Sequence, residues 1–120
     1  MKLNVLIVDD SKTVRKIMRA ILEELGHNVI DEASNGNGAI ELFFKHSPDL
    51  ITMDIEMPGM SGIDAIAKIK KINKKIKVIM ITAHGQKDIV TSSIGKGAND
   101  YILKPITKEK LEASIKKLFP

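Results

Sequence analysis

Five short apolar runs recur along the chain, with segments of helical character between them. A run of this kind, apolar on both faces, is typical of a strand in a parallel sheet that helices cover on each side. The alternation of such strands with helices predicts an α/β fold, an open and doubly wound parallel sheet with right-handed crossovers. The five runs are VLIV (5–8), VI (29–30), LITM (50–53), VIMI (78–81) and YIL (101–103).

The clearest helical segment is 11–25, where apolar residues recur every three or four positions and Gly26 follows as a stop signal. We expect shorter helices at 38–46, across 63–69, and after Thr107, whose side chain suits an N-cap. The apolar stripe of the first helix consists of Val14, Ile17, Met18, Ile21, Leu22 and Leu25.

The helix expected within 86–97 is the weakest in the chain. The Thr-Ser-Ser run at 91–93 is poor in helix formers, and Gly95 and Gly97 loosen the end of the segment. A helix of low stability also suits an element that has to move when the protein changes state.

The chain of 120 residues is long enough for one domain with its own core, which we expect to span 1–120 without room for an effector domain. It has no cysteine, so disulfides and thiolate metal sites are excluded. The N-terminal apolar run is too short for a signal peptide, and no run is long enough to span a membrane. We therefore expect a cytoplasmic protein with no membrane insertion.

The formal net charge is +4, and nearly all of the 19 basic residues are lysine. The densest cluster, KIKKINKKIK at 68–77, raises the question of a nucleic-acid patch. No aromatic residue interleaves with these lysines, and a protein that reads bases or phosphates usually shows arginine. The cluster is better explained as the solvated end of a helix, where lysine complements the helix dipole, so we expect no nucleic-acid partner.

Polar residues follow four of the five predicted strands. Asp9 and Asp10 follow the first run, Asp54 the third, Thr82 the fourth and Lys104 the fifth. In open α/β sheets, ligands bind outside the carboxyl ends of the strands. Each of these residues alone has an ordinary use in a cap, a strand or a surface, but their coincidence at one sheet edge indicates a binding site.

Three carboxylates at one edge repel one another, so either their pKa values rise or a cation joins them. A set of oxygen ligands without cysteine or clustered histidine favours a hard ion, and few protein ligands favour Mg²⁺ over Ca²⁺. Together with Lys104 and a hydroxyl, the ion would form a receptor for a phosphoryl group. Asp54 would then be the nucleophile that attacks phosphorus and forms an acyl phosphate.

A nucleotide is not the expected phosphate source. No G-x-x-x-x-G-K-[ST] loop occurs, and GKG at 95–97 is too short and lies late in a predicted helix. The phosphoryl donor should therefore be another phosphorylated molecule.

The motifs VLIVDDS, TMDIEMPGMSG, MITA and YILKP, in this order and spacing, resemble the receiver domain of two-component response regulators over the whole chain. The stretches TMDIEMPGMSGI and TAHGQK resemble stand-alone chemotaxis response regulators in particular. The resemblance implies a flavodoxin-like sheet of five parallel strands in the order 2-1-3-4-5 with five flanking helices. It also implies a signalling switch that is activated by phosphorylation.

The same resemblance assigns roles around the acidic residues. Asp54 matches the phospho-acceptor, and Asp10 and Asp54 match the side-chain ligands of Mg²⁺. Asp9 would act mainly through a bound water, and the main-chain carbonyl of Glu56 would complete the protein ligands of the metal.

Further residues match the phosphate-binding and switch positions of the family. Thr82 matches the hydroxyl that bonds the phosphoryl group, and the small Ala83 beside it leaves access. Lys104 matches the lysine that contacts the phosphate, and Pro105 matches a proline that the family has after a cis peptide bond. Tyr101 matches the aromatic residue of the switch.

Two positions that vary in the family affect how long the acyl phosphate lasts. These are Glu56, two residues after the acceptor, and His84, two residues after the threonine. The carboxylate of Glu56 would either repel the phosphoryl charge or engage Lys104, and the sequence leaves this choice open.

The resemblance implies a chemotaxis histidine kinase as donor and a flagellar or archaellar motor switch or adaptor protein as target, with a phosphatase as a further partner. The chain would act as a monomer and catalyse only its own phosphorylation and dephosphorylation. The alternative is a phosphorelay intermediate or another kind of single-domain response regulator.

Two other classes of protein are disfavoured by particular residues. A haloacid-dehalogenase-type phosphatase or mutase has a second aspartate two residues after its nucleophile, where this chain has Glu56 followed by Met57 and Pro58. A flavin-binding module needs glycines, hydroxyls and amides after the first strand to hold a phosphate. This chain has Asp9 and Asp10 there, and their charges would repel one.

Overall fold

A computed structural model describes residues 1–83, 85 and 87–120 of the chain, and these residues form five strands and five helices. The strands are all parallel and lie in the order β2-β1-β3-β4-β5, which confirms the predicted architecture. In chain order the elements are β1 (Asn4–Val8), α1 (Lys12–Glu24), β2 (Asn28–Ala33), α2 (Gly36–His46), β3 (Leu50–Asp54), α3 (Gly62–Ile72), β4 (Lys77–Thr82), α4 (Lys87–Gly95), β5 (Asp100–Leu103) and α5 (Lys108–Leu118).

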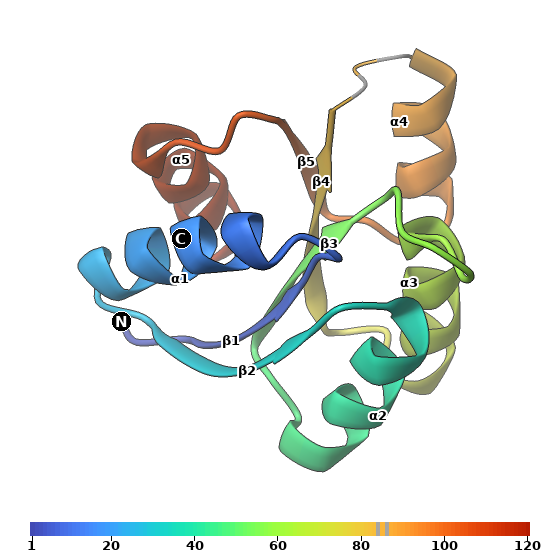
Figure 1. The fold of residues 1–120 in the computed structure, drawn as a ribbon, viewed down its shortest axis with the longest axis horizontal. Helices are drawn as coiled ribbons and strands as arrows, with labels where there is room; N and C mark the ends of the chain where they lie inside the picture. Colours follow the sequence, from blue (N-terminus) through green and yellow to red (C-terminus); the bar gives the residue numbers. More distant parts are fainter. Residues whose placement is uncertain (84, 86) are drawn as a thin grey trace.

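Helices cover both faces of the sheet, with α1 and α5 on one face and α2, α3 and α4 on the other (Figure 1). Each face has its own apolar cluster: Val5 and Ile7 of β1 pack toward α1 and α5, while Leu6 and Val8 pack toward α2 and α3. The central strand β3 is buried along its whole length. This two-sided burial is the physical reason why the strands read as continuous apolar runs.

Side-chain caps begin four of the helices. Ser11, Asn35, Ser61 and Thr107 each accept a hydrogen bond from the backbone N–H three residues later. The cap predicted at Thr107 is therefore confirmed. Because Asn35 caps α2, this helix begins at Gly36, two residues before the predicted start.

Strand β2 is longer than the apolar pair 29–30 suggested, because it continues through Asp31 and Glu32 to Ala33. Glu32 pairs with two arginines of α1 and Asp31 contacts His46 of α2, so both carboxylates have polar partners within the strand. The predicted stripe of α1 is wrong at Ile17, which is 48% exposed, whereas Met18 and Leu22 are buried. Ile17 lies at the border of the stripe, where periodicity alone does not decide which side chains meet the sheet.

The part of the chain that the structure describes contains no helix long and apolar enough to cross a membrane.

Candidate functional site

Three carboxylates meet at the carboxyl edge of the sheet. Asp9 follows β1 and is 3% exposed, Asp54 ends β3 and is 2% exposed, and Asp10 beside them is exposed. Each of the three offers an oxygen, and these oxygens all lie within 4.8 Å of one another. The strands β1 and β3 are neighbours in the sheet, so the fold itself brings these residues together.

Two backbone N–H groups hold the buried carboxylates in place. The N–H of Ser11 donates to Oδ1 of Asp9 at 2.9 Å, and the N–H of Glu56 donates to Oδ1 of Asp54 at 3.2 Å. Lys104, which follows β5, brings its ammonium group to both acids: its Nζ lies 3.3 Å from Oδ2 of Asp9 and 3.6 Å from Oδ1 of Asp54. The site thus combines two buried carboxylates with one shared cation.

The electrostatics of the site work against a fully ionised cluster. Desolvation by burial is the largest effect on Asp54 and, together with the negative charge of Asp9, raises the pKa of Asp54 to about 6. The charge of Lys104 and the N–H of Glu56 oppose this rise without cancelling it. A further cation near the three carboxylates would therefore be stabilised.

The donor set fits Mg²⁺. Three carboxylates offer only hard oxygen ligands, and Asp10 is exposed at the mouth of the cluster, which leaves access for water ligands. Because the three oxygens lie within 4.8 Å of one another, one ion between them can contact more than one carboxylate.

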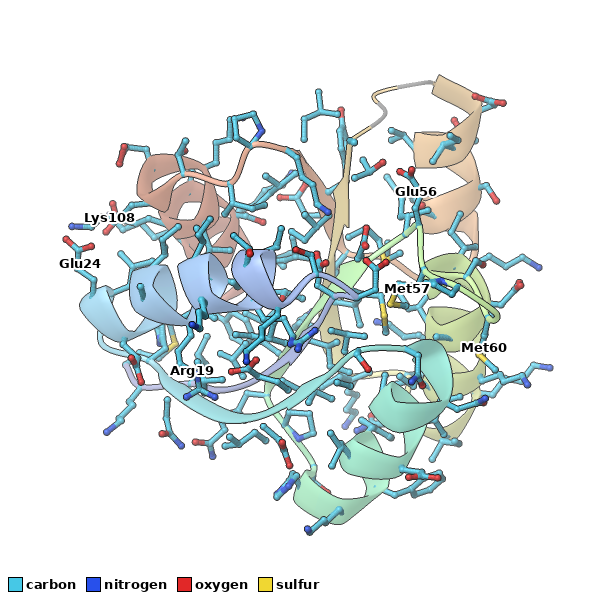
Figure 2. The ribbon with its side chains drawn as sticks, viewed as in Figure 1. Arg19, Glu24, Glu56, Met57, Met60 and Lys108 are labelled. Carbon is cyan, nitrogen blue, oxygen red and sulfur yellow. The ribbon has the colours of Figure 1, made fainter. Side chains whose placement is uncertain are left out.

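The hydroxyl of Thr82 lies at the end of β4 and is fully buried. Its Oγ1 donates a hydrogen bond to Oε1 of Glu56 at 3.3 Å. Glu56 lies on the segment between β3 and α3 (Figure 2). The structure thus shows a contact between Glu56 and the hydroxyl, while Lys104 pairs with Asp9 and Asp54.

The other predicted positions surround this centre. Ala83 is exposed beside Thr82, and the N–H of Lys104 donates to the carbonyl of Thr82 at 2.8 Å, which joins the ends of β4 and β5. The Lys104–Pro105 peptide bond is cis. Tyr101 lies in the edge strand β5 and is 39% exposed. The prediction for His84 falls outside the described residues.

Sequence reasoning missed Gly62, the first residue of α3. A Cβ at this position would overlap the main-chain oxygen of Asp54, and the N–H of Gly62 donates to the carbonyl of Ile55 at 2.9 Å. The absence of a side chain allows α3 to begin directly against the segment that carries Asp54. The signal that could have found it is a glycine at a helix start, where a residue with a side chain is the ordinary choice.

The profile of the response regulator receiver domain matches residues 5–116 of the chain. The chain belongs to this family. Solved structures share its fold: a chain of the CheX-CheY-BeF3-Mg+2 complex from Borrelia burgdorferi superposes with a TM-score of 0.94 at 37% identity, and the match covers 98% of this chain and 89% of that chain.

Similar sequences place this receiver domain among chemotaxis relatives. The chemotaxis protein CheY of Bacillus subtilis is 43% identical over 113 residues, which are 94% of each chain. The chemotaxis protein CheY of Thermotoga maritima is 41% identical over 114 residues, which are 95% of each chain. The predicted resemblance to receiver domains of the chemotaxis type is therefore confirmed.

Proposed function

We propose that this receiver domain is a chemotaxis switch that accepts a phosphoryl group on Asp54 from a histidine kinase. The observation that carries the proposal is the meeting of Asp54, Asp9 and Asp10 with Lys104 at one edge of the sheet. Carboxylates that repel one another lower the stability of the fold, even beside a lysine. Groups of charged residues with such unfavourable interactions are common at functional sites.

In the proposed reaction, an oxygen lone pair of ionised Asp54 attacks the phosphorus of a phosphohistidine. The new P–O bond forms as the P–N bond breaks, and the bonding electrons leave with the imidazole, which takes up a proton. Lys104 lies close to Oδ1 of Asp54 and can balance the charge of the phosphoryl oxygens. When bound, Mg²⁺ would supply further charge stabilisation, with Asp10 and Asp54 as its carboxylate ligands. Apart from forming and losing this acyl phosphate, the chain catalyses no reaction.

The chemotaxis relatives support a motor switch or adaptor protein as the target, and a chemotaxis kinase as donor. A CheY of Borrelia burgdorferi was solved in complex with CheX, which supports a further protein partner for this chain, and we propose a phosphatase in that role. The output face would be formed by α4, β5 and α5, because Thr82 precedes α4 in the chain and the exposed Tyr101 lies in β5.

The decisive experiment is phosphorylation by acetyl phosphate, followed by mass spectrometry of the intact protein. In this reaction the P–O bond to acetate breaks and acetate leaves with the bonding electrons. Wild type should take up one phosphoryl group when Mg²⁺ is present and none when the metal is chelated. Asp54→Asn keeps the size of the side chain but lacks the nucleophilic oxygen, so it should take up none.

Asp64→Asn is the matched control, because it removes an exposed carboxylate from α3 outside the acidic cluster. It should be phosphorylated like wild type. Equal incorporation in wild type and Asp54→Asn would overturn the assignment of the acceptor. A phosphorelay role would instead be indicated if the phosphorylated chain passed its phosphoryl group on to a second histidine protein.

A further inference from the structure

Strand β2 contains a bulge that decides which way its acidic residues face. Val5 of β1 pairs with Val29, but the next residue, Leu6, pairs with Asp31, so β2 has one extra residue at this point. Val29 packs toward α1, and plain alternation would place residue 31 on that face and residue 32 on the other. The bulge reverses this order, so Glu32 faces α1.

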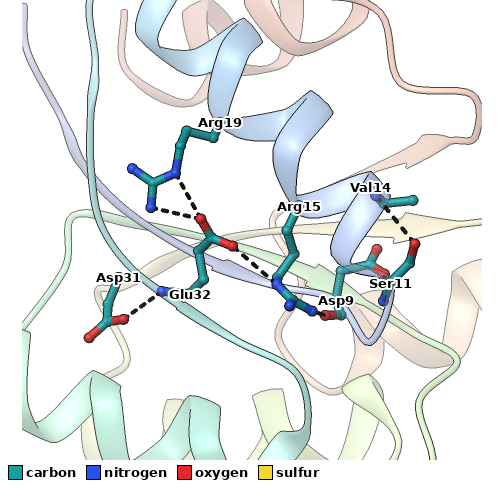
Figure 3. A network of polar contacts seen from close by, with 7 residues as sticks. All are labelled: Asp9, Ser11, Val14, Arg15, Arg19, Asp31 and Glu32. Carbon is teal, nitrogen blue, oxygen red and sulfur yellow. Dashed lines mark hydrogen bonds and ion pairs between the residues drawn. The ribbon is translucent and has the colours of Figure 1, made fainter.

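Two arginines of α1 bind Glu32 on that face. The Nε of Arg15 donates to Oε1 of Glu32 at 3.1 Å, and Arg19 contacts Oε2 at 2.7 Å (Figure 3). Asp31 faces the other side of the sheet, where its Oδ2 lies 3.0 Å from Nε2 of His46. Arg15 is the more buried of the two arginines, since its side chain is 17% exposed against 38% for Arg19.

Only one of these arginines reaches the acidic site through a contact in the described part of the chain. The Nη1 of Arg15 donates to the main-chain carbonyl of Asp9 at 2.7 Å (Figure 3). The N–H of Asp9 donates to the carbonyl of Ala33, at the end of β2, at 3.0 Å. Both peptide groups that flank Asp9 are thus tied to β2, one directly and the other through Arg15 and Glu32.

We propose that Arg15, held by Glu32, is a positioning residue that keeps Asp9 in the geometry needed for the metal site. Asp9 needs such support, because its buried carboxylate lies close to those of Asp10 and Asp54 and is repelled by both. This inference rests on the proposed Mg²⁺ site. The competing explanation is that the two arginines only fasten α1 to the edge of the sheet.

Arg19 separates these explanations, because it binds Glu32 as Arg15 does. Arg15→Met and Arg19→Met each remove one positive charge and the ion pair with Glu32, and Arg15→Met alone also removes the contact with Asp9. Loss of a positive charge near a cation site strengthens cation binding on electrostatic grounds. The change in charge alone would therefore make Arg15→Met bind Mg²⁺ more tightly. Weaker Mg²⁺ binding in this variant would have to come from the lost contact with Asp9.

The experiment is an Mg²⁺ titration followed by amide NMR shifts, on wild type and both variants, with the free energy of unfolding measured in parallel. Arg15→Met should bind Mg²⁺ about tenfold more weakly, as is common when a partner of a metal ligand is removed. The Mg²⁺ affinity of Arg19→Met should stay within about twofold of the wild-type affinity, because Arg19 does not contact Asp9 in the described part of the chain. Glu32→Gln, which loosens Arg15 without removing it, should give a loss between these two.

Arg15→Lys provides a conservative variant should Arg15→Met fold poorly. It can still donate to the carbonyl of Asp9 and should recover part of the lost Mg²⁺ affinity. Equal Mg²⁺ affinity in Arg15→Met and Arg19→Met would overturn the positioning role and leave the proposed metal site intact. Absence of Mg²⁺-dependent shifts near Asp9, Asp10 and Asp54 in wild type would overturn both the metal site and this inference.

Discussion

The hydroxyl of Thr82 donates a hydrogen bond to the carboxylate of Glu56, with Oγ1 and Oε1 3.3 Å apart. In the proposed switch this hydroxyl has to bond a phosphoryl oxygen on Asp54. A carboxylate oxygen is an acceptor of the same kind as a phosphoryl oxygen. Glu56 therefore competes with the phosphoryl group for the hydroxyl of Thr82. In the unphosphorylated protein this hydroxyl already has a hydrogen-bond acceptor in Glu56.

Removing this competitor should favour the phosphorylated form. A hydrogen bond to a charged group contributes roughly 1.5–3 kcal/mol, and the length of this contact places it at the low end. Glu56→Ala should therefore bind the phosphate mimic beryllofluoride about tenfold more tightly than wild type. The affinity is measured by fluorine NMR titration.

Glu41→Ala is the control for this prediction, because it removes an exposed carboxylate from α2 and changes the net charge by the same amount. If Glu41→Ala gains as much affinity as Glu56→Ala, the gain comes from net charge and the competition with Thr82 is wrong.

The raised pKa of Asp54 makes the stability of the metal-free protein depend on pH. The pKa rises from 3.8 to about 6 on folding, so the protonated form favours the folded state. Stability from this group is full below pH 3.8 and is lost as the pH rises through about 6. Asp54→Asn has no charge to bury, and it should be more stable than wild type at pH 7.5 by about 3 kcal/mol.

Chemical denaturation with EDTA present, at pH 7.5 and at pH 4, tests this expectation. The difference between wild type and Asp54→Asn should shrink toward zero at the lower pH, where the carboxyl group of Asp54 is mostly protonated. Added Mg²⁺ should stabilise wild type at pH 7.5 more than it stabilises Asp54→Asn. A constant difference across the pH range would contradict a raised pKa.

Gly62 is expected to be the least replaceable glycine near the site. Gly62→Ala places a Cβ against the main-chain oxygen of Asp54, so the segment between β3 and α3 has to shift. We expect a loss of about 1–3 kcal/mol in the free energy of unfolding, together with weaker Mg²⁺ binding.

Gly95→Ala is the matched control for Gly62→Ala, since its Cβ would meet no atom within 4 Å at the end of α4. It should keep Mg²⁺ affinity and gain a few tenths of a kcal/mol from helix propensity. Thermal unfolding and the Mg²⁺ titration compare the two variants. Equal effects of the two substitutions would show that Gly62 has no special role.

The parallel sheet and the position of the site could both be predicted, because they depend on patterns that the sequence carries locally. An apolar run predicts a buried strand, and parallel strands bring their carboxyl ends to one edge, so Asp9, Asp54 and Lys104 had to be neighbours. The contact of Glu56 with Thr82 was not predicted, and the choice between repelling the phosphoryl charge and engaging Lys104 stayed open. It depends on the rotamer of one side chain on a loop, which the sequence does not fix.

The role of β2 was hidden for a related reason. In the sequence, Asp31 and Glu32 suggest that the strand ends before them, because burying a charged group without a partner is unfavourable. Those partners lie far away in the sequence, on α1 and α2, and the bulge that turns Glu32 toward α1 leaves no local signal. Long-range ion pairs and strand register are therefore the parts of this site that only the structure shows.

Thr82 and Tyr101 should connect phosphorylation to the output face. Thr82 ends β4 and can turn its hydroxyl to a new phosphoryl oxygen, which vacates space behind it. Tyr101 is 39% exposed on the adjacent strand β5, so its ring can move inward to fill that space. A phosphoryl group would then shift an equilibrium between two conformations, with a coupling of about 1–3 kcal/mol.

Thr82→Ala should accept beryllofluoride at Asp54 and yet lose most of the amide shifts that the mimic causes in α4, β5 and α5 of wild type. Tyr101→Ala should likewise keep binding of the mimic and lose the response of these elements. Tyr101→Phe retains the ring and should respond as wild type does, which makes it the control. If Thr82→Ala and Tyr101→Ala both show the full wild-type shifts in α4 and β5, these residues do not transmit the signal, because the output face then changes without them.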